Sequence, residues 1–392
     1  MSTHRWLLPE YIDDLLPNEA ESVERIRRRI LDHFAVHGYR LVRPPLLEHV
    51  ESLQTGTGNE LDLYTFKVVD QLSGRLLGLR ADTTLQVARI DAHLLNEPGI
   101  TRLCYAGSVV HTRPMGLGAT REVMQIGAEL YGHAGIAADR EVLRLMLSSL
   151  TMLGTQRLHL DLGHVGVFRA LVDAARLDSD RASDLFDAMR LKDLPGIGEL
   201  VGDLPEPARG SFLALPELYG EANEVLERAI GSLPSLPAIG RALEDLRTLV
   251  GAIDDRQVAV QVDLAELRDL DYHNGVVFSV YAEGHAAAIG RGGRYDNIGG
   301  AFGRDRAATG FSLYPRQLAE RVRVAPSRTG ILAPDGDDPA LHAEIERLRA
   351  HGDVVVVAIE GDTADPRAHR CDRRLVVAAA SGGGWRVENI QS

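Results

Sequence analysis

The stretch Gln125-Ile126-Gly127-Ala128-Glu129 alternates polar or small residues with apolar ones. Because successive side chains of a β-strand point to opposite faces of a sheet, Gln125, Gly127 and Glu129 are expected on one face and the two apolar residues on the other. A carboxamide and a carboxylate on either side of a glycine gap suit the floor of a ligand pocket. The same pattern occurs on the solvent face of an ordinary antiparallel sheet, so this stretch alone predicts a strand and not a site.

Further strands are predicted on both sides of this one. Segments 103–111 and 122–131 flank a loop rich in glycine and proline, which favours an antiparallel pair. The other predicted strands of this part of the chain lie at 39–42, 64–69, 75–80, 257–264, 276–283 and 286–291. Strands connected in this way, with helices between them, predict an α+β fold built on an antiparallel sheet flanked by helices.

The spacing of apolar residues predicts the helices and the domain boundaries. A helix is predicted to begin at Asn18, a candidate N-cap with Glu21 three residues later as a capping box. Residues 165–250 carry apolar residues at helical spacing, interrupted by prolines, and have few strand signals, which predicts a helical insert. The expected domains are 1–325, which contains this insert, and 326–392, a small C-terminal α/β module.

The charge and composition exclude several classes of protein. The 392 residues contain 43 Lys and Arg against 56 Asp and Glu, a net charge of −13, so most of the surface would repel a nucleic acid. Two distant cysteines, and histidines without metal-ligand spacing, indicate neither a disulfide framework nor a metal site. The sequence has no run of 18 uncharged apolar residues that would predict a membrane span. We expect a cytoplasmic protein with no metal, no cofactor, and no membrane or nucleic-acid partner.

Three further clusters of polar residues each have an ordinary structural explanation. The glycine-rich run 290–296 (GRGGRYD) has neither a P-loop lysine nor the spacing of a dinucleotide-binding loop, and its glycines suit close packing of strands. Asp82 and Thr84 open a predicted helix, where capping alone would explain them. The charged segment 268–273 (RDLDYH) fits a solvated turn with a local ion pair. None of the three identifies a site when it is taken singly.

Taken in order, these pieces resemble class II aminoacyl-tRNA synthetases, and in particular the catalytic domain of histidyl-tRNA synthetase. The resemblance covers about residues 8–320. It rests on the segments 14–17 (DLLP), 44–45 (PP), 79–84 (LRADTT), 125–129 (QIGAE), 268–273 (RDLDYH) and 292–296 (GGRYD). The fold that it implies is a class II synthetase-like antiparallel sheet with flanking helices.

The departures from the synthetase pattern lie where that family binds ATP. At the positions of its motif 2 arginine and carboxylate this chain has His111 and Arg113, and in motif 3 Gln317 replaces the phosphate-binding arginine. Formation of an adenylate brings a carboxylate to a triphosphate, so the transition state depends on fixed positive charge. Because the loss of one such donor typically costs on the order of 10² to 10³ in rate, we expect no aminoacylation and assign no catalytic residue.

The amino-acid side of the synthetase pocket is largely retained. The resemblance implies a histidine site made of Asp82, Thr84, Gln125, Glu129, Arg268, Tyr272 and His273. In it, Asp82 would bind the ammonium group of the ligand, Glu129 and Tyr272 the imidazole nitrogens, and Arg268 the carboxylate. His273 stands where the synthetases have a second tyrosine. A buried carboxylate that must meet an imidazole N–H rejects ligands that lack this donor.

A synthetase-like chain without the ATP-binding groups resembles the regulatory subunits of ATP phosphoribosyltransferase, and segments 104–108 (CYAGS) and 111–114 (HTRP) are close to that family's pattern. The resemblance implies a subunit with no chemistry of its own. Such a subunit self-associates as a dimer within a hetero-octamer, activates a short catalytic subunit in the first step of histidine biosynthesis, and conveys inhibition by histidine. The pattern leaves open whether histidine binds in this pocket or at a subunit interface.

Two other functions remain to be compared with this one. The first is a divergent but active histidyl-tRNA synthetase, an enzyme. The second is a free-standing RNA-binding module, which the acidic charge disfavours. The C-terminal segment 328–392 has 8 arginines against 11 acidic residues and a single aromatic residue, Trp385. An anticodon-binding domain needs a basic face and stacking groups, so this segment suits that task poorly.

Overall fold

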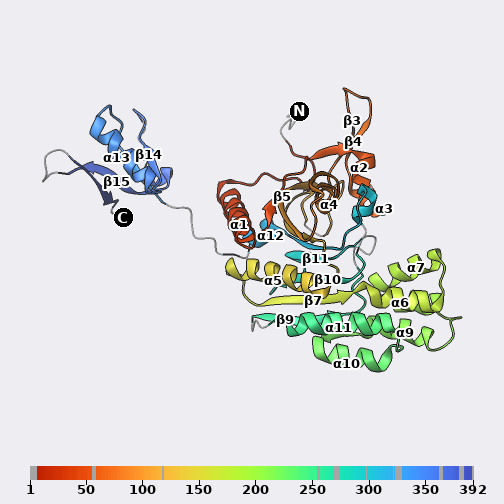
Figure 1. Cartoon of the computed structure of the whole chain (residues 1–392). Helices are drawn as coiled ribbons and strands as arrows, with labels where there is room; N and C mark the ends of the chain where they lie inside the picture. The colour runs from red at the N-terminus through yellow and green to blue at the C-terminus, as the bar shows by residue number, and fades with distance from the viewer. Residues whose placement is uncertain are drawn as a thin grey trace, which may run out of the picture. The chain divides into compact units, whose positions relative to one another are not determined.

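A computed structural model of the chain describes residues 7–54, 59–116, 119–253, 257–267, 273–296, 298–320, 322, 329–361, 365–378 and 384–390. The chain divides into two compact units, Met1–Val324 and Ala325–Ser392. Figure 1 shows the helices and strands of each unit.

The first unit is built on a nine-stranded sheet with the strand order β1-β5-β6-β12-β11-β10-β7-β9-β8. Its strands are β1 (Arg40–Leu41), β5 (Thr101–Val110), β6 (Glu122–Tyr131), β7 (Leu158–His164), β8 (Tyr219–Glu221), β9 (Val258–Asp263), β10 (Val276–Ala282), β11 (Gly290–Arg294) and β12 (Ala308–Leu313). Neighbouring strands are antiparallel except in the pairs β1/β5 and β7/β9. The mixed helix and sheet content and the antiparallel centre confirm the predicted fold class.

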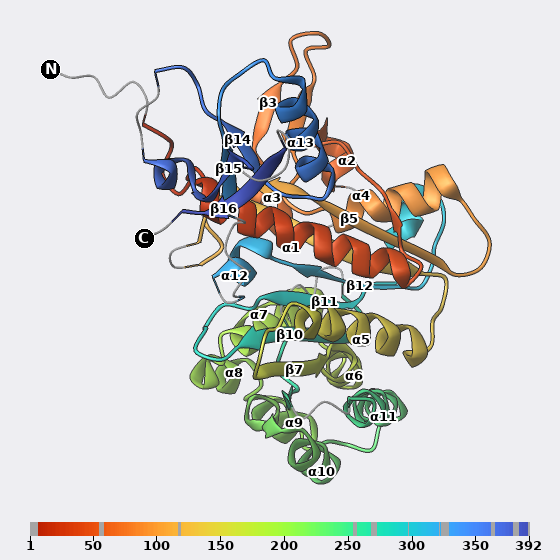
Figure 2. The same ribbon diagram turned by 90° about the vertical axis from the view of Figure 1, so that its left-hand side faces the viewer.

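Two long helices cover one face of this sheet, as Figure 2 shows. The helices α1 (Pro17–Val36) and α5 (Ile136–Met152) form a single core with the apolar side chains of β6, namely Ile126, Ala128 and Leu130. Phe34 of α1 meets Phe311 of β12 edge to face, with ring centroids 5.6 Å apart. The alternation of β6 therefore directs Gln125 and Glu129 to the opposite face, as the sequence predicts.

The start of α1 differs from the predicted capping box. The helix begins at Pro17, and its N-cap residue Leu16 makes no side-chain hydrogen bond. Asn18 lies inside the first turn, where its carbonyl accepts a hydrogen bond from the hydroxyl of Ser22. Proline suits this position because the first backbone N–H groups of a helix have no partner within it.

A small sheet and a helix border the other face of the main sheet. The strands β2 (Leu47–His49), β4 (Leu76–Leu79) and β3 (Lys67–Val69) pair in that order, so that β3 and β4 form the predicted hairpin. Next to them lie α2 (Val50–Gln54), α3 (Asn59–Tyr64) and α4 (Thr84–Arg89), which continues as the π-helical turn η1 (Ile90–Leu95). This arrangement brings the segment 79–84 beside β6.

Residues 165–251 are mainly helical. The helices are α6 (Val165–Ala175), α7 (Ser179–Arg190), α8 (Leu194–Leu200), α9 (Ala208–Ala214), η2 (Leu215–Glu217), α10 (Ala222–Ser232) and α11 (Pro237–Gly251). Between η2 and α10 the short strand β8 pairs with β9 and forms the edge of the main sheet. The sequence did not predict this strand, because three residues are too few for an alternation to be read. The short helices η3 (Ile298–Phe302) and α12 (Pro315–Ala319) complete the first unit.

The second unit is a four-stranded sheet with the order β14-β13-β15-β16. Its elements are β13 (Gly330–Ala333), α13 (Pro339–Ala350), β14 (Val355–Val357), η4 (Pro366–His369), β15 (Cys371–Val377) and β16 (Trp385–Asn389). Strand β13 is parallel to both of its neighbours, and β15 and β16 are antiparallel. Leu341, Ile345 and Leu348 of α13 pack against Ile331 and Leu375 of this sheet in a core of their own.

Candidate functional site

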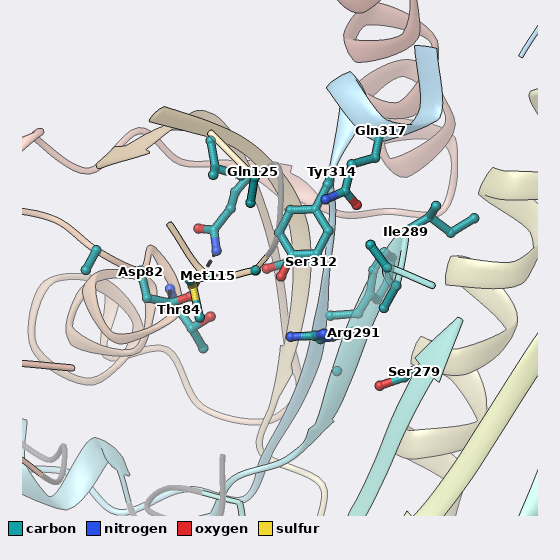
Figure 3. A pocket seen from close by; sticks show the side chains of 18 of the residues that line it. Asp82, Thr84, Met115, Gln125, Ser279, Ile289, Arg291, Ser312, Tyr314 and Gln317 are labelled. Atoms are coloured by element: carbon teal, nitrogen blue, oxygen red, sulfur yellow. Dashed lines mark hydrogen bonds between the residues drawn. The ribbon is translucent and has the colours of Figure 1, made fainter. Parts of the chain in front are cut away.

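A cavity of about 620 Å³ lies over the polar face of the main sheet (Figure 3). Of the seven residues that the sequence predicts for a histidine site, five line this cavity: Asp82, Thr84, Gln125, Glu129 and His273. The other two, Arg268 and Tyr272, lie outside the described residues, so their predicted roles stay predictions. Residues from distant segments of the chain therefore meet at one place.

Asp82 and Gln125 form one hydrogen-bonded group at the start of α4. The carboxylate of Asp82 accepts a hydrogen bond from the backbone N–H of Thr84 at 2.7 Å and another from Nε2 of Gln125 at 3.0 Å. The side-chain oxygen Oε1 of Gln125 accepts hydrogen bonds from the hydroxyl of Thr83 at 2.9 Å and from the backbone N–H of Thr83 at 3.2 Å. Asp82 thus helps to cap the helix, as the structural explanation predicts, and also presents a carboxylate to the cavity.

Glu129 is the most deeply buried carboxyl group of the cavity, with an exposed fraction of 1%. Tyr295 donates a hydrogen bond of 2.6 Å from its hydroxyl to Oε2 of Glu129, and the hydroxyl of Tyr131 lies 3.1 Å from that of Tyr295. Burial raises the pKa of Glu129 to about 8, even though hydrogen bonds from Tyr295, Tyr105 and Thr84 act to lower it. At neutral pH Glu129 therefore carries mainly a protonated carboxyl group, which ionises more readily when a hydrogen-bond donor approaches it.

Two glycines give the carboxyl group of Glu129 its space. In the sheet register Glu129 pairs with Gly310 of β12, and Gly310 pairs with Gly293 of β11. A Cβ atom on Gly310 would overlap the carboxylate of Glu129, and one on Gly293 would come within 2.8 Å of the ring of His273. The glycine-rich run at 290–296 thus serves strand packing beside the pocket and is not a phosphate loop.

The raised pKa of Glu129 predicts a specific dependence of stability on pH. Between about pH 4.5 and 8 the folded chain keeps a proton on Glu129 that the unfolded chain releases, so the free energy of unfolding falls as the pH rises. One such group contributes a slope of roughly 1.4 kcal/mol per pH unit. The variant Glu129→Gln lacks this group, so we expect it to gain stability relative to the wild type from pH 5 to 8, as measured by urea denaturation. Parallel stability curves for the two chains would contradict the assignment.

Other cavity residues were not in the predicted set. Tyr295 lines the cavity and bonds to Glu129. The hydroxyl of Tyr105 lies 2.7 Å from that of Ser312, which also lines the cavity. Arg291 also lines the cavity. Its position in a run of glycines was visible in the sequence, but nothing in the sequence told which face of β11 it occupies.

The two positions that carry an arginine for ATP in the synthetase pattern have His111 and Gln317 here, and Arg113 stands at the position of the carboxylate. Burial lowers the pKa of His111, and its Nε2 lies 2.8 Å from the carbonyl oxygen of Ala81. The guanidinium of Arg113 lies over the ring of Tyr64, 4.8 Å from its centroid. Gln317 lines the cavity, and its Oε1 is buried without a hydrogen-bond partner among the described residues. These three side chains could not hold a triphosphate as two arginines would.

No group of three or more His, Cys, Asp or Glu residues within the described ranges is arranged to hold a metal ion. None of the helices in the same ranges has both the length and the apolar character needed to cross a bilayer.

Comparison with known sequences gives the same two-part organisation. A profile described as histidyl-tRNA synthetase matches residues 11–318, and one described as the C-terminal domain of the ATP phosphoribosyltransferase subunit HisZ matches residues 328–388. Proteins named ATP phosphoribosyltransferase regulatory subunit are similar over 99% of this chain. They include those of Cupriavidus taiwanensis (53% identity, 99% of its length), Paraburkholderia xenovorans (52%, 99%) and Burkholderia cenocepacia (53%, 100%).

Solved structures with the same fold carry both kinds of name. A Bacillus halodurans protein, titled ATP phosphoribosyltransferase regulatory subunit/histidyl-tRNA synthetase, is similar with a TM-score of 0.82 and 26% identity over 94% of this chain and 96% of its own. The histidyl-tRNA synthetase of a Nostoc species has a TM-score of 0.78 over 96% of this chain and 92% of its own. At 17% identity the second likeness shows the fold alone.

Proposed function

Because the chain belongs to the family of ATP phosphoribosyltransferase regulatory subunits, we propose that it activates a short catalytic subunit of this enzyme and conveys inhibition by histidine. The first step of histidine biosynthesis would then be switched on by assembly and off by its end product. The relatives are named as regulatory subunits, which agrees with the absence of an aminoacylation reaction in this proposal.

The observation that carries the proposal is the contrast between the two ends of the cavity. At the amino-acid end, carboxyl groups and a carboxamide are held in place by hydrogen bonds, as at Asp82, Gln125 and Glu129. At the triphosphate end, a buried histidine and Gln317 stand where the synthetases have charged groups. Such a cavity favours a small amino acid over ATP, because a polyanion needs fixed positive charge.

The bound histidine is oriented by its charges. Asp82 accepts from the ammonium group, and Thr84 and Gln125 hold the main-chain end of the ligand. The carboxyl group of Glu129 accepts a hydrogen bond from one imidazole N–H. It ionises as this N–H approaches, since a hydrogen-bond donor favours the ionised form of a carboxyl group. His273 closes the pocket on the side of Gly293. By resemblance, Tyr272 binds the other imidazole nitrogen and Arg268 contributes to binding of the carboxylate.

Inhibition requires that histidine bind one assembly state better than another. A ligand with equal affinity for both states shifts nothing. In the proposal, dimers of this chain and the short catalytic chains form a hetero-octamer in the cytoplasm, with neither nucleic acid nor membrane as a partner. Histidine in the cavity then favours the less active state of this assembly.

The proposal predicts that activity appears when the two chains are mixed. A short catalytic chain alone should transfer phosphoribosyl groups to ATP slowly, and addition of the full-length regulatory chain should raise that rate. Histidine should then lower it. The measurement is the absorbance of phosphoribosyl-ATP formed from ATP and phosphoribosyl pyrophosphate at several ratios of the two chains.

The same preparation decides against the rival synthetase. Histidine-dependent exchange of pyrophosphate into ATP by the regulatory chain alone would show that it is an active enzyme and would overturn the proposal. A blank exchange assay together with calorimetric binding of histidine supports a sensor. Retention of transfer RNA on a filter at moderate salt would favour the RNA-binding function instead.

A further inference from the structure

Strand β11 carries two arginines in very different surroundings. Arg294 is saturated, because its guanidinium bonds to Asp139, to Asp296 and to the carbonyl oxygens of His133 and Gly135. Arg291 lies three residues earlier, on the opposite face of the strand, and lines the cavity. Its Nε is buried and has no hydrogen-bond partner among the described residues. A buried donor without a partner is costly, so its retention in a pocket points to a ligand that completes it.

The cavity contains several carboxyl groups and one strong cation. Asp82, Glu129, Glu266 and Glu320 all line it, whereas Arg291 is the single arginine or lysine among the described lining residues. A ligand whose anionic end enters this cavity therefore has Arg291 to meet it. The planar guanidinium suits a carboxylate, because both groups can form two parallel hydrogen bonds.

The sheet register places Arg291 at a suitable distance from Glu129. Arg291 pairs with Ser312, and Ser312 pairs with Gly127, so these three residues form one row across the sheet. Glu129, Gly310 and Gly293 form the next row on the same face, about 7 Å away for two residues of a strand. In histidine, two carbon atoms separate the ring from the carboxylate. A ring held at Glu129 thus leaves the carboxylate within reach of the long side chain of Arg291, which extends into the cavity in Figure 3.

We propose that Arg291 binds the carboxylate of the amino acid in this cavity and makes the site selective for the acid over the corresponding alcohol or amine. This inference rests on the proposed sensing of histidine and adds the group that reads its carboxylate. Without a carboxylate to pair with, the buried Nε of Arg291 stays without an acceptor, so ligands such as histidinol and histamine are rejected. The sensor then responds to the finished amino acid and not to related imidazoles.

The test compares two ligands on matched variants of the full-length chain in complex with the catalytic chain. Calorimetry should show that the wild type binds histidine about 100-fold more tightly than histidinol. In Arg291→Gln, histidine should bind about 10- to 100-fold more weakly while the affinity for histidinol changes little. The matched control is Arg113→Gln, which removes a guanidinium near the cavity that stacks on Tyr64. This variant should keep the preference.

Several outcomes would overturn the assignment. If Arg291→Gln keeps the preference, or if Arg268→Gln or Arg113→Gln alone removes it, another arginine reads the carboxylate. If Arg291→Gln fails to fold, Arg291→Lys is used instead, because it keeps the charge but lacks the planar guanidinium. The role of Arg291 is then refuted if Arg291→Lys keeps the preference for histidine over histidinol and the wild type binds histidine methyl ester as tightly as histidine. If the wild type binds neither histidine nor histidinol, the proposed sensing of histidine fails together with the role of Arg291. If the wild type binds histidine and Arg291→Gln keeps the preference, only the role of Arg291 fails.

Discussion

Replacing Glu129 by alanine is expected to abolish inhibition by histidine in the assembled ATP phosphoribosyltransferase. The imidazole N–H of the ligand would lose its carboxyl acceptor, and the hydroxyl of Tyr295 would lose the acceptor that lies 2.6 Å away. A hydrogen bond to a charged group contributes about 1.5–3 kcal/mol. The variant also leaves the buried hydroxyl of Tyr295 without this acceptor and creates a cavity. We therefore expect the concentration of histidine needed for half inhibition to rise by at least about 100-fold.

The measurement is a histidine titration of the activity of the mixed chains, with sedimentation velocity to verify that the complex forms. Glu129→Gln is the conservative variant, since it keeps the shape and the acceptor for Tyr295 but loses the charge. We expect it to weaken inhibition by about tenfold. The control Tyr131→Phe removes a hydroxyl that is hydrogen-bonded to Tyr295 and should have a smaller effect. Unchanged inhibition in Glu129→Ala would mean that histidine acts at a different place, such as a subunit interface.

The proton on Glu129 adds a second signature to the same site. Because the pKa of Glu129 is about 8, binding of a ligand N–H near neutral pH should release a proton as the carboxylate forms. Heats of histidine binding should therefore depend on the ionisation enthalpy of the buffer. In Glu129→Gln this dependence should be lost.

The sequence contained enough information for the pocket floor but not for its connections. The alternation of 125–129 is a local property with a period of two residues, so it predicts the strand and both of its faces from five residues. The partner of Glu129 is Tyr295, which lies 166 residues away along the chain. No local pattern specifies such a pair, and only the register of β6, β12 and β11 brings the two together.

The two arginines of β11 show the same limit more sharply. Both lie in one glycine-rich run, and the local sequence pattern does not indicate which of them faces a ligand. Their roles diverge because side chains three residues apart on a strand face opposite ways. Arg294 therefore pairs with Asp139 of α5 and with Asp296, which follows β11, whereas Arg291 lines the cavity. The predicted N-cap at Asn18 failed for a related reason, since Pro17 fits the first turn without any side-chain cap.

Loss of the buried ion pair between Arg294 and Asp139 is expected to destabilise the fold strongly. The side chains are 8% and 1% exposed, and Nη2 of Arg294 lies 2.6 Å from Oδ2 of Asp139. Removal of Asp139 leaves the buried guanidinium of Arg294 with Asp296 as its remaining carboxylate among the described residues. Loss of one member of a buried pair typically costs about 3–5 kcal/mol. We expect this loss in Asp139→Ala, measured by urea denaturation of the full-length chain at neutral pH.

The matched control is the exposed pair Arg157 and Glu283, whose side chains are 75% and 56% exposed. Because water screens such a pair, Glu283→Ala should cost less than about 1 kcal/mol. The double variant Asp139→Leu with Arg294→Met should recover much of the loss of Asp139→Ala, since it replaces both buried charges of the pair by apolar side chains. Asp296 keeps the hydrogen bond from the backbone N–H of Ala308. Equal destabilisation by Asp139→Ala and Glu283→Ala would refute the importance of burial here.

This pair also connects the stability of the fold to the site. Arg294 is the last residue of β11 and is followed directly by Tyr295, whose hydroxyl bonds to Glu129. Asp296 joins the same network, because it accepts hydrogen bonds from Arg294 and from the backbone N–H of Ala308 on β12. Once Asp139 no longer holds Arg294, Tyr295 is free to move away from Glu129. Histidine binding should therefore weaken in Asp139→Ala at temperatures where the chain is still folded, whereas Glu283→Ala should bind histidine as the wild type does.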